Sequence, residues 1–137
     1  MSHEFLIDNT LKDLERHEGF REKPYFDSRG VLTFGHGLTY ITREESLILA
    51  HRRLDGVYLK QLRRLFPKLD DLSPARQEVL LNMIYNLGYT GLSKFARMRK
   101  AIDDGDFKGA HDEMLDSRWR THVGARAVEL AEKMRRG

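Results

Sequence analysis

The chain has 137 residues, of which 40% are hydrophobic and 33% are charged, and its formal net charge is +3 at pH 7. This length and composition suit one compact globular domain and exclude an intrinsically disordered chain. There is no cysteine, which excludes disulfides, thiolate metal ligands and a cysteine nucleophile.

The N-terminal segment lacks the features of a secretion signal. Residues 1–13 carry acids and have neither a basic leading region nor a long apolar stretch. No apolar run approaches the roughly 20 residues that span a bilayer. We therefore expect a protein that is made in the cytoplasm without a signal peptide and that has no stable membrane association.

The first predicted element is a helix that ends at Glu18. Ile7, Leu11 and Leu14 recur at helical spacing, and Gly19 is placed where a helix commonly stops. Glu18 is then the last helical residue.

A β-hairpin is predicted next. Pro24 cannot continue a helix, and residues 25–35 alternate between apolar and polar types. The four residues 27–30 begin with Asp27 and end with Gly30, which is typical of a tight turn. The hairpin therefore turns at Asp27.

One long helix of about six turns is predicted after the hairpin. Thr42 and Glu45 form a capping box at its start, Pro67 ends it, and Gly56 is tolerated inside it. The apolar residues that keep the helical period are Leu47, Ala50, Leu54, Tyr58, Leu62 and Leu65.

The C-terminal half is predicted to be helical throughout. Ser73 and Pro74 form an N-cap with a first-turn proline, and the helix that they open runs to Gly88. Three shorter helices are expected after Ser93, after Asp106 and from about Thr121 to the end. The whole is a mostly helical α+β fold, organised as a single domain with a hairpin part at about 1–41, the long helix at 42–66 and a helical part at 67–137.

Three polar residues of the N-terminal part are candidates for chemistry. Glu18 at a helix C-terminus faces the negative end of the helix dipole, which favours the protonated form that a general acid requires. Each residue also has a simpler structural interpretation. Glu18 can be a solvated side chain, Asp27 can bond the backbone of its own turn, and Thr33 can be an ordinary strand residue. Their order on a helix end, a turn and a returning strand is more informative, because a hairpin can bring distant positions together.

These residues follow a known pattern. The segments 18–21, 25–27 and 33–37, with Gly30 between them, resemble the active-site segment of the phage-type lysozymes, glycoside hydrolase family 24. Residues 82–95, residues 117–119 and Arg126 resemble the C-terminal part of the same family in matching order. The resemblance covers nearly the whole chain and implies a lysozyme-like, two-lobed fold in which a long helix joins the small hairpin lobe to the larger helical lobe.

The resemblance implies a role for each matching residue. Glu18 would protonate the leaving glycosidic oxygen, and Asp27 would stay ionised and position the attacking water, which Thr33 would help to hold. The reaction would be an inverting hydrolysis of the β-1,4 bond between N-acetylmuramic acid and N-acetylglucosamine in peptidoglycan. In the larger lobe, Tyr85 and Asn86 would line the substrate cleft.

The resemblance also implies that Arg126 lies near Glu18 and restrains it. For Trp119, a core position between helices is the favoured interpretation, rather than a sugar platform. We expect neither a cofactor nor a metal.

The chain departs from the family pattern at four positions. Leu38 stands where the family has a histidine, and His36 lies two residues earlier, where an extended segment would present it on the same face. Met98 and Glu113 occupy positions that are polar substrate contacts in the family.

Two other functions are weighed against catalysis. The first is a catalytically weak peptidoglycan-binding module of the same fold, and the presence of both Glu18 and Asp27 disfavours it. The second is a nucleic-acid binder, which is disfavoured because the arginines of residues 118–137 are interleaved with apolar residues instead of forming one stripe. The resemblance therefore leads us to expect a monomeric lysozyme of a phage or prophage that binds peptidoglycan, does not bind nucleic acid and acts on the cell wall after its release, causing lysis. The sequence is compatible with both a free endolysin and a tail-associated enzyme.

Overall fold

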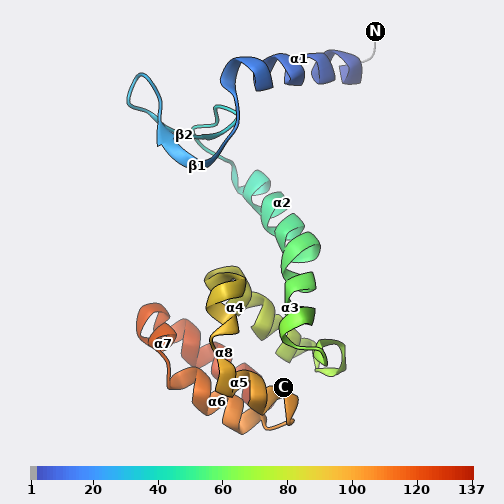
Figure 1. Ribbon diagram of the computed structural model, residues 1–137, viewed down its shortest axis with the longest axis vertical. Helices are drawn as coiled ribbons and strands as arrows, with labels where there is room; N and C mark the ends of the chain where they lie inside the picture. Colours follow the sequence, from blue (N-terminus) through green and yellow to red (C-terminus); the bar gives the residue numbers. More distant parts are fainter. Residues whose placement is uncertain (1–2) are drawn as a thin grey trace. The chain divides into compact units, whose positions relative to one another are not determined.

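The computed structural model describes residues 3–137 and consists of two compact units. The first unit ends at Ile48, and the second comprises Leu49–Gly137. Figure 1 follows the chain from the first helix, in blue, to the last, in red. The mostly helical α+β class expected from the sequence is confirmed.

The first unit contains one complete helix, a hairpin and the start of α2 (Arg43–Arg53). Helix α1 (His3–Glu18) is followed by strands β1 (Arg21–Phe26) and β2 (Leu32–Gly35), which form a two-stranded antiparallel sheet (Figure 1). The helix end predicted at Glu18 and the predicted hairpin are both confirmed.

The register of the hairpin determines where Thr33 lies. Tyr25 is opposite Thr33, and Arg21 is opposite Gly35. The pairing shifts between Arg21 and Tyr25, in the part of β1 that contains Pro24, which has no N–H to donate to the partner strand. Thr33 thus sits on the returning strand, beside the end of β1.

The predicted long helix is continuous from its cap to its last residue. It consists of α2 (Arg43–Arg53), a π-helical turn η1 (Leu54–Tyr58) and α3 (Leu59–Leu65), with helical backbone angles at both junctions. The capping box is present, since the Glu45 N–H donates to Thr42 Oγ1 (3.2 Å) and Thr42 Oγ1 donates to the Glu45 carboxylate (3.0 Å).

The π-helical turn is a feature that the helical period did not predict. The apolar residues from Ala50 to Leu62 are spaced four apart, and a step of four overshoots an α-helical turn of 3.6 residues. A wider turn takes up the extra residue. Gly56, which was expected inside a regular α-helix, lies in this turn.

The second unit is entirely helical beyond α3. A short 3₁₀ turn η2 precedes α4, and four further helices complete the chain. Their bounds are η2 (Leu69–Asp71), α4 (Pro74–Ser93), α5 (Ala96–Asp103), α6 (Phe107–Leu115), α7 (Arg118–Val123) and α8 (Ala125–Arg136).

Local signals account for the start of α4 and for a break within it. Ser73 Oγ accepts the Arg76 N–H (3.2 Å), and Pro74 occupies the first turn, as predicted. Gly88 has non-helical angles (φ 75°, ψ 172°) and kinks the helix before Ser93.

The last helix predicted from the sequence is in fact two helices. The expectation of one helix from about Thr121 to the end is wrong, because Gly124 adopts a positive φ of 59° and separates α7 from α8. Ser117 begins α7, where its hydroxyl accepts the Arg120 N–H (3.3 Å).

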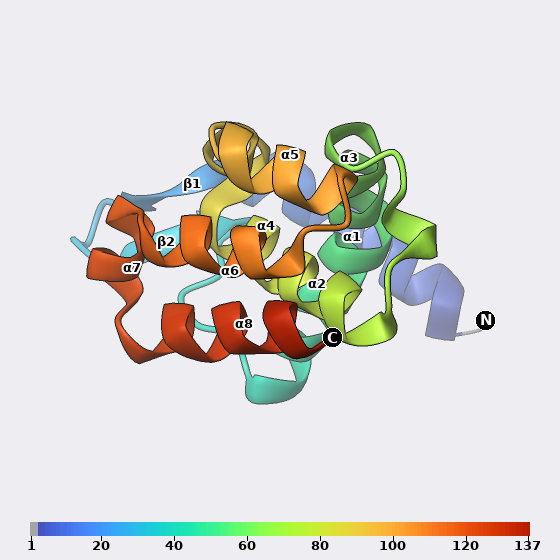
Figure 2. The same ribbon diagram turned by 90° about the horizontal axis from the view of Figure 1, so that it is seen from below.

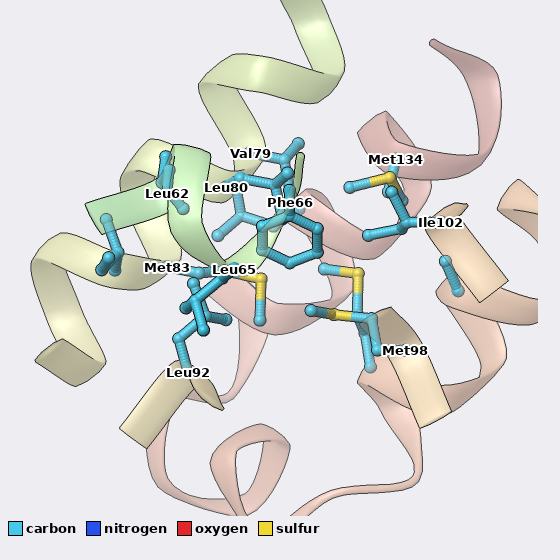
Figure 3. Packing of buried hydrophobic residues seen from close by; sticks show 14 of the residues in the cluster. Leu62, Leu65, Phe66, Val79, Leu80, Met83, Leu92, Met98, Ile102 and Met134 are labelled. Carbon is cyan, nitrogen blue, oxygen red and sulfur yellow. The ribbon is translucent and has the colours of Figure 1, made fainter. Parts of the chain in front are cut away.

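The hydrophobic core belongs to the second unit. Within the described residues, every buried hydrophobic side chain lies between Leu62 and Met134, whereas Thr33 is the sole buried residue of the first unit. Helices α6 and α8 pack side by side (Figure 2). Figure 3 shows Phe66, just after α3, among core side chains that include Leu80 and Met98.

Arg76 ties the start of α4 to the end of α8. Its guanidinium lies 3.5 Å from the centre of the Phe107 ring, and it donates to the backbone oxygens of Met134 (2.8 Å) and Arg135 (3.0 Å). Partial burial lowers the pKa of Arg76 from its usual value. The guanidinium thus provides hydrogen-bond donors for carbonyl groups that a helix leaves unpaired at its C-terminus.

The position of the core predicts unequal effects for two valines. Val79 is fully buried, and Val128 is 48% exposed. Val79→Ala is expected to lower the free energy of unfolding by about 2 kcal/mol, because two buried methyl groups are lost and a cavity remains. Val128→Ala should cost no more than about 0.5 kcal/mol. Urea titration followed by circular dichroism measures both, and equal losses would contradict the assignment of the core.

Candidate active site

Glu18 ends α1 and packs against the backbone of Gly37. Gly19, with φ 69°, terminates the helix, and its N–H bonds the Glu15 carbonyl (3.0 Å). A Cβ atom added to Gly37 would lie 2.8 Å from Glu18 Oε2 and 3.0 Å from Cδ. Gly37 also has a φ of 78°. Both the space and the backbone angle therefore require glycine at position 37.

The carboxyl of Glu18 has no polar partner in the described part of the chain. Among residues 3–137, none donates a hydrogen bond to it or forms an ion pair with it. A carboxyl without such partners can receive and deliver a proton without first breaking a protein hydrogen bond.

The segment after β2 is a tight loop. Phe34 and Leu38 exchange two backbone hydrogen bonds of 2.8 Å, and Gly35 and Gly37 both have positive φ angles. The extended segment that would present His36 on the same face as position 38 is therefore not formed, and that expectation is wrong. The His36 ring instead contacts the Phe20 ring, with centroids 5.3 Å apart.

Asp27 is held in the hairpin turn by backbone groups. Its Oδ1 accepts the N–H groups of Arg29 (2.8 Å) and Val31 (2.9 Å), and its own carbonyl accepts the Gly30 N–H (3.0 Å). Its Oδ2 is 3.7 Å from the Arg29 guanidinium. One carboxylate oxygen is thus used by the fold, and the other remains available.

The same contacts keep Asp27 ionised. The hydrogen bond from Val31, assisted by the N–H and the positive charge of Arg29, lowers the pKa of Asp27 below its usual 3.8, and partial burial opposes this effect. The charged form is fully present at neutral pH. Its stabilising contribution is lost only as the pH falls below 3.8 and through the folded-state pKa.

Thr33 is buried, with 4% of its surface exposed, and its hydroxyl donates to the Val31 carbonyl (2.9 Å). The hydroxyl has a single proton, so Thr33 can only accept a hydrogen bond from any further partner. The Val31 N–H donates to Asp27 Oδ1, and the Val31 carbonyl accepts the Thr33 hydroxyl. Both candidate side chains therefore bond the backbone of the same residue.

In the second unit, Arg126 and Tyr85 line a pocket of about 430 Å³. Asn82 Oδ1 accepts hydrogen bonds from Arg126 Nε (2.9 Å) and Nη2 (2.5 Å). The Tyr85 ring, 44% exposed, stands edge-on to the Tyr58 ring. The residues that line this pocket are Ala50, Leu54, Glu78, Leu81, Asn82, Tyr85 and Arg126.

Asn82 is a residue whose role the sequence analysis missed. Its position three residues before Tyr85 puts the two on one face of α4, and this spacing was the available signal. Its bond to Arg126 joins residues 44 positions apart, which no local pattern indicates.

Asn86 and Trp119 lie apart from that pocket. The Trp119 indole N–H donates to Asn86 Oδ1 (2.8 Å), and the Trp119 ring packs edge-on against Phe95. Trp119 is 4% exposed, so its predicted core position is confirmed. The side-chain oxygen of Asn86 therefore links α4 to α7.

A larger pocket of about 610 Å³ lies where α4, α5 and α7 meet. Met98 and Glu113, the two departures from the family pattern, both line it, and Met98 is buried. Three cations on its wall, Lys94, Arg97 and Arg118, make no ion pair within the described part of the chain.

We also searched the described residues for a membrane-spanning helix and for a metal site. Among residues 3–137, no helix is long and apolar enough to cross a membrane. The same residues contain no cluster of histidine and acidic side chains suited to a metal ion.

Three similar proteins come from bacteriophages. The pre-baseplate central spike protein Gp5 of Enterobacteria phage T4 is 28% identical over 148 residues, which cover 85% of this chain and 26% of Gp5. The SAR-endolysin of Bacteriophage PS119 is 34% identical over 119 residues, with 80% of this chain and 66% of that protein covered. The SAR-endolysin of Escherichia phage Mu is 29% identical over 137 residues, covering 89% and 77% respectively.

The chain thus spans about a quarter of Gp5 and just under two thirds of the PS119 protein. The model of the phage lysozyme family matches residues 15–136. This match includes Glu18, the hairpin and every helix from α2 to α8. With its lysozyme-like α+β fold, the chain belongs to the phage lysozyme family.

Proposed function

We propose that this chain hydrolyses the β-1,4 bond between N-acetylmuramic acid and N-acetylglucosamine in bacterial peptidoglycan, with inversion at the anomeric carbon. The observation that carries the proposal is the contrast between two carboxyl groups of the first unit. Asp27 accepts two backbone hydrogen bonds that favour its charge, whereas Glu18 accepts none from the residues that the structure describes. Different environments for two carboxyls are what acid and base roles require.

Glu18 is the proposed general acid. Its carboxyl contacts the Gly37 backbone without a polar bond, so its proton is available to the glycosidic oxygen as the bond to the leaving sugar breaks. Protonation is needed because an unprotonated sugar alkoxide is a poor leaving group. General acid catalysis of this kind typically contributes about 10²- to 10⁴-fold.

Asp27 and Thr33 are proposed to hold the attacking water. The second oxygen of Asp27, Oδ2, which faces the Arg29 guanidinium and accepts no backbone hydrogen bond, accepts one proton of the water. Thr33 Oγ1, whose own proton goes to Val31, accepts the other. With both protons engaged, a lone pair of the water is directed at the anomeric carbon. Asp27 removes the first of these protons as the new carbon–oxygen bond forms.

The second unit is proposed to bind the glycan. Arg126, fixed by two bonds to Asn82 Oδ1, retains N–H donors for a sugar or peptide oxygen. Tyr85 offers a half-exposed ring face in the same pocket. Asn86 keeps its amide NH₂ group for a substrate carbonyl, since only its oxygen is used by Trp119.

The relatives support a role in wall degradation. Two of them are named SAR-endolysins, which favours an enzyme that degrades peptidoglycan for cell lysis. Gp5 is named a central spike protein. We assign to this chain the endolysin role, acting on peptidoglycan as a monomer.

The first test is Glu18→Gln. The amide keeps the shape of the side chain but cannot deliver a proton, so the rate of wall clearing should fall by at least about 10²-fold. Turbidity of purified peptidoglycan, together with identification of new reducing ends, measures the loss. Activity within about tenfold of the unmodified chain would exclude Glu18 as the acid, whereas an unmodified chain that binds peptidoglycan without cutting it would be a binding module.

A matched pair of substitutions separates the two roles of Asp27. Asp27→Asn keeps an oxygen for the Arg29 and Val31 N–H groups but removes the charge, so the hairpin should remain while activity falls about 10²- to 10⁴-fold. Asp27→Ala removes both and should also lower the thermal unfolding midpoint below that of the Asn variant. If Asp27→Asn retained activity, Asp27 would have only its structural role in the turn.

Stereochemistry tests the assignment of the water. If water attacks directly, the first product of a β-linked glycan is the α-anomer, and the two carboxyls stand roughly 6.5 to 9.5 Å apart during the reaction. Proton nuclear magnetic resonance of the product, recorded before mutarotation, distinguishes the anomers. An initial β-anomer would mean that Asp27 attacks the sugar itself.

A further inference from the structure

We propose that His36 is a positioning residue for Glu18. Through its ring contact with Phe20, it holds the loop of residues 35–37 against the Glu18 carboxyl, so that the proton donor keeps one orientation. This inference rests on the proposed role of Glu18 as the general acid.

The Glu18 side chain depends on the loop because no polar group of residues 3–137 restrains its carboxyl. Its carboxyl has no hydrogen bond or ion pair with the described residues, and a free glutamate populates many rotamers. Three consecutive atoms, Cγ, Cδ and Oε2, lie 3.2, 3.0 and 2.8 Å from the position that a Cβ of Gly37 would occupy. The carboxyl therefore lies along the backbone at Gly37, and its orientation follows the position of that backbone.

The loop itself has little intrinsic rigidity. Two of its three residues are glycines, which have the widest conformational freedom of any residue. The Phe34 and Leu38 bonds close its base, but they lie outside the residues that touch Glu18. The one side chain within the loop that can restrain its tip belongs to His36.

His36 supplies that restraint through Phe20. The two rings are 5.3 Å apart at an interplanar angle of 39°, within the range of favourable aromatic contacts. Phe20 is only two residues beyond Glu18. The ring contact therefore joins the residue just after α1 to the loop that touches the Glu18 carboxyl. The backbone on both sides of the Glu18–Gly37 contact is held by this one pair of rings.

The exposure of these rings argues against a role in a core. Phe20 is 62% exposed, and His36 is exposed, so their contact buries little apolar surface. Removing the His36 ring should consequently leave the fold intact and affect what the loop touches. This separation makes a positioning role measurable.

The test compares His36→Ala with His36→Phe and with His3→Ala. His3 is an exposed histidine of α1 with no ring partner among the described residues, so its variant controls for the loss of a surface imidazole. On soluble glycan strands prepared from peptidoglycan, His36→Ala should lower kcat about three- to tenfold, the range that one aromatic contact can support. KM should change less than about twofold, and His36→Phe should restore kcat because it keeps a ring on Phe20.

A second readout does not depend on activity. In the unmodified protein, nuclear Overhauser effects should connect the Glu18 Hγ protons to the Gly37 Hα protons; they should weaken in His36→Ala and persist in His36→Phe and His3→Ala. Unchanged Overhauser effects in His36→Ala, or an equal loss of kcat in His36→Phe, would overturn the inference. If the unmodified protein proved inactive while the Overhauser effects behaved as expected, the proposed function would fail, but the restraint of Glu18 by His36 would stand.

Discussion

The carboxylate of Asp27 binds two backbone N–H groups, and the geometry of the first unit follows from that interaction. The bonds to Arg29 and Val31 close the turn and start β2 at a defined register. This register sets Thr33 beside the turn and delivers the chain into the 35–37 loop. The loop then meets Glu18. A change in the turn would accordingly displace both the residues proposed to bind water and the loop that contacts the proposed acid, so one aspartate serves the fold and the proposed chemistry together.

In the second unit, the helices that form the hydrophobic core also carry the polar side chains of the pocket. Asn82 and Tyr85 face the smaller pocket from α4, while Met83 and Ile84 between them are fully buried. The core thus fixes the helix from which the pocket is built. Arg126 reaches the same pocket from α8 and is oriented by Asn82.

Local chemistry made much of this structure predictable. The caps at Thr42 and Ser73 and the stop after Glu18 depend on residues within one helical turn of each other, so the sequence displays them directly. The same holds for the hairpin and for the placement of Glu18 at the end of α1, Asp27 in the turn and Thr33 on the returning strand. These predictions needed no knowledge of how the helices pack.

The features that escaped prediction depend on backbone angles or on distant partners. Residues 35–37 were expected to be extended because a glycine in the sequence does not indicate whether its φ is positive or negative. The positive φ of Gly124, which divides the expected last helix, was missed for the same reason. The bond between Asn82 and Arg126 links two helices. The spacing of four between the apolar residues from Ala50 to Leu62, which the π-helical turn accommodates, resembles an ordinary helical period. Such features are decided by tertiary packing rather than by neighbouring residues.

The confinement of the hydrophobic core to the second unit has a consequence for damaged molecules. The described part of the first unit, residues 3–48, has a two-stranded hairpin and no buried apolar side chain, and such hairpins are marginal in water. A protease that cut near Ile48 would release a segment that unravels, while the remaining helical fragment kept its packed interior. That fragment would carry Tyr85, Asn86 and Arg126 but neither carboxyl of the proposed acid and base. If the second unit binds glycan as proposed, this fragment would compete for glycan strands without cleaving them and would inhibit intact molecules.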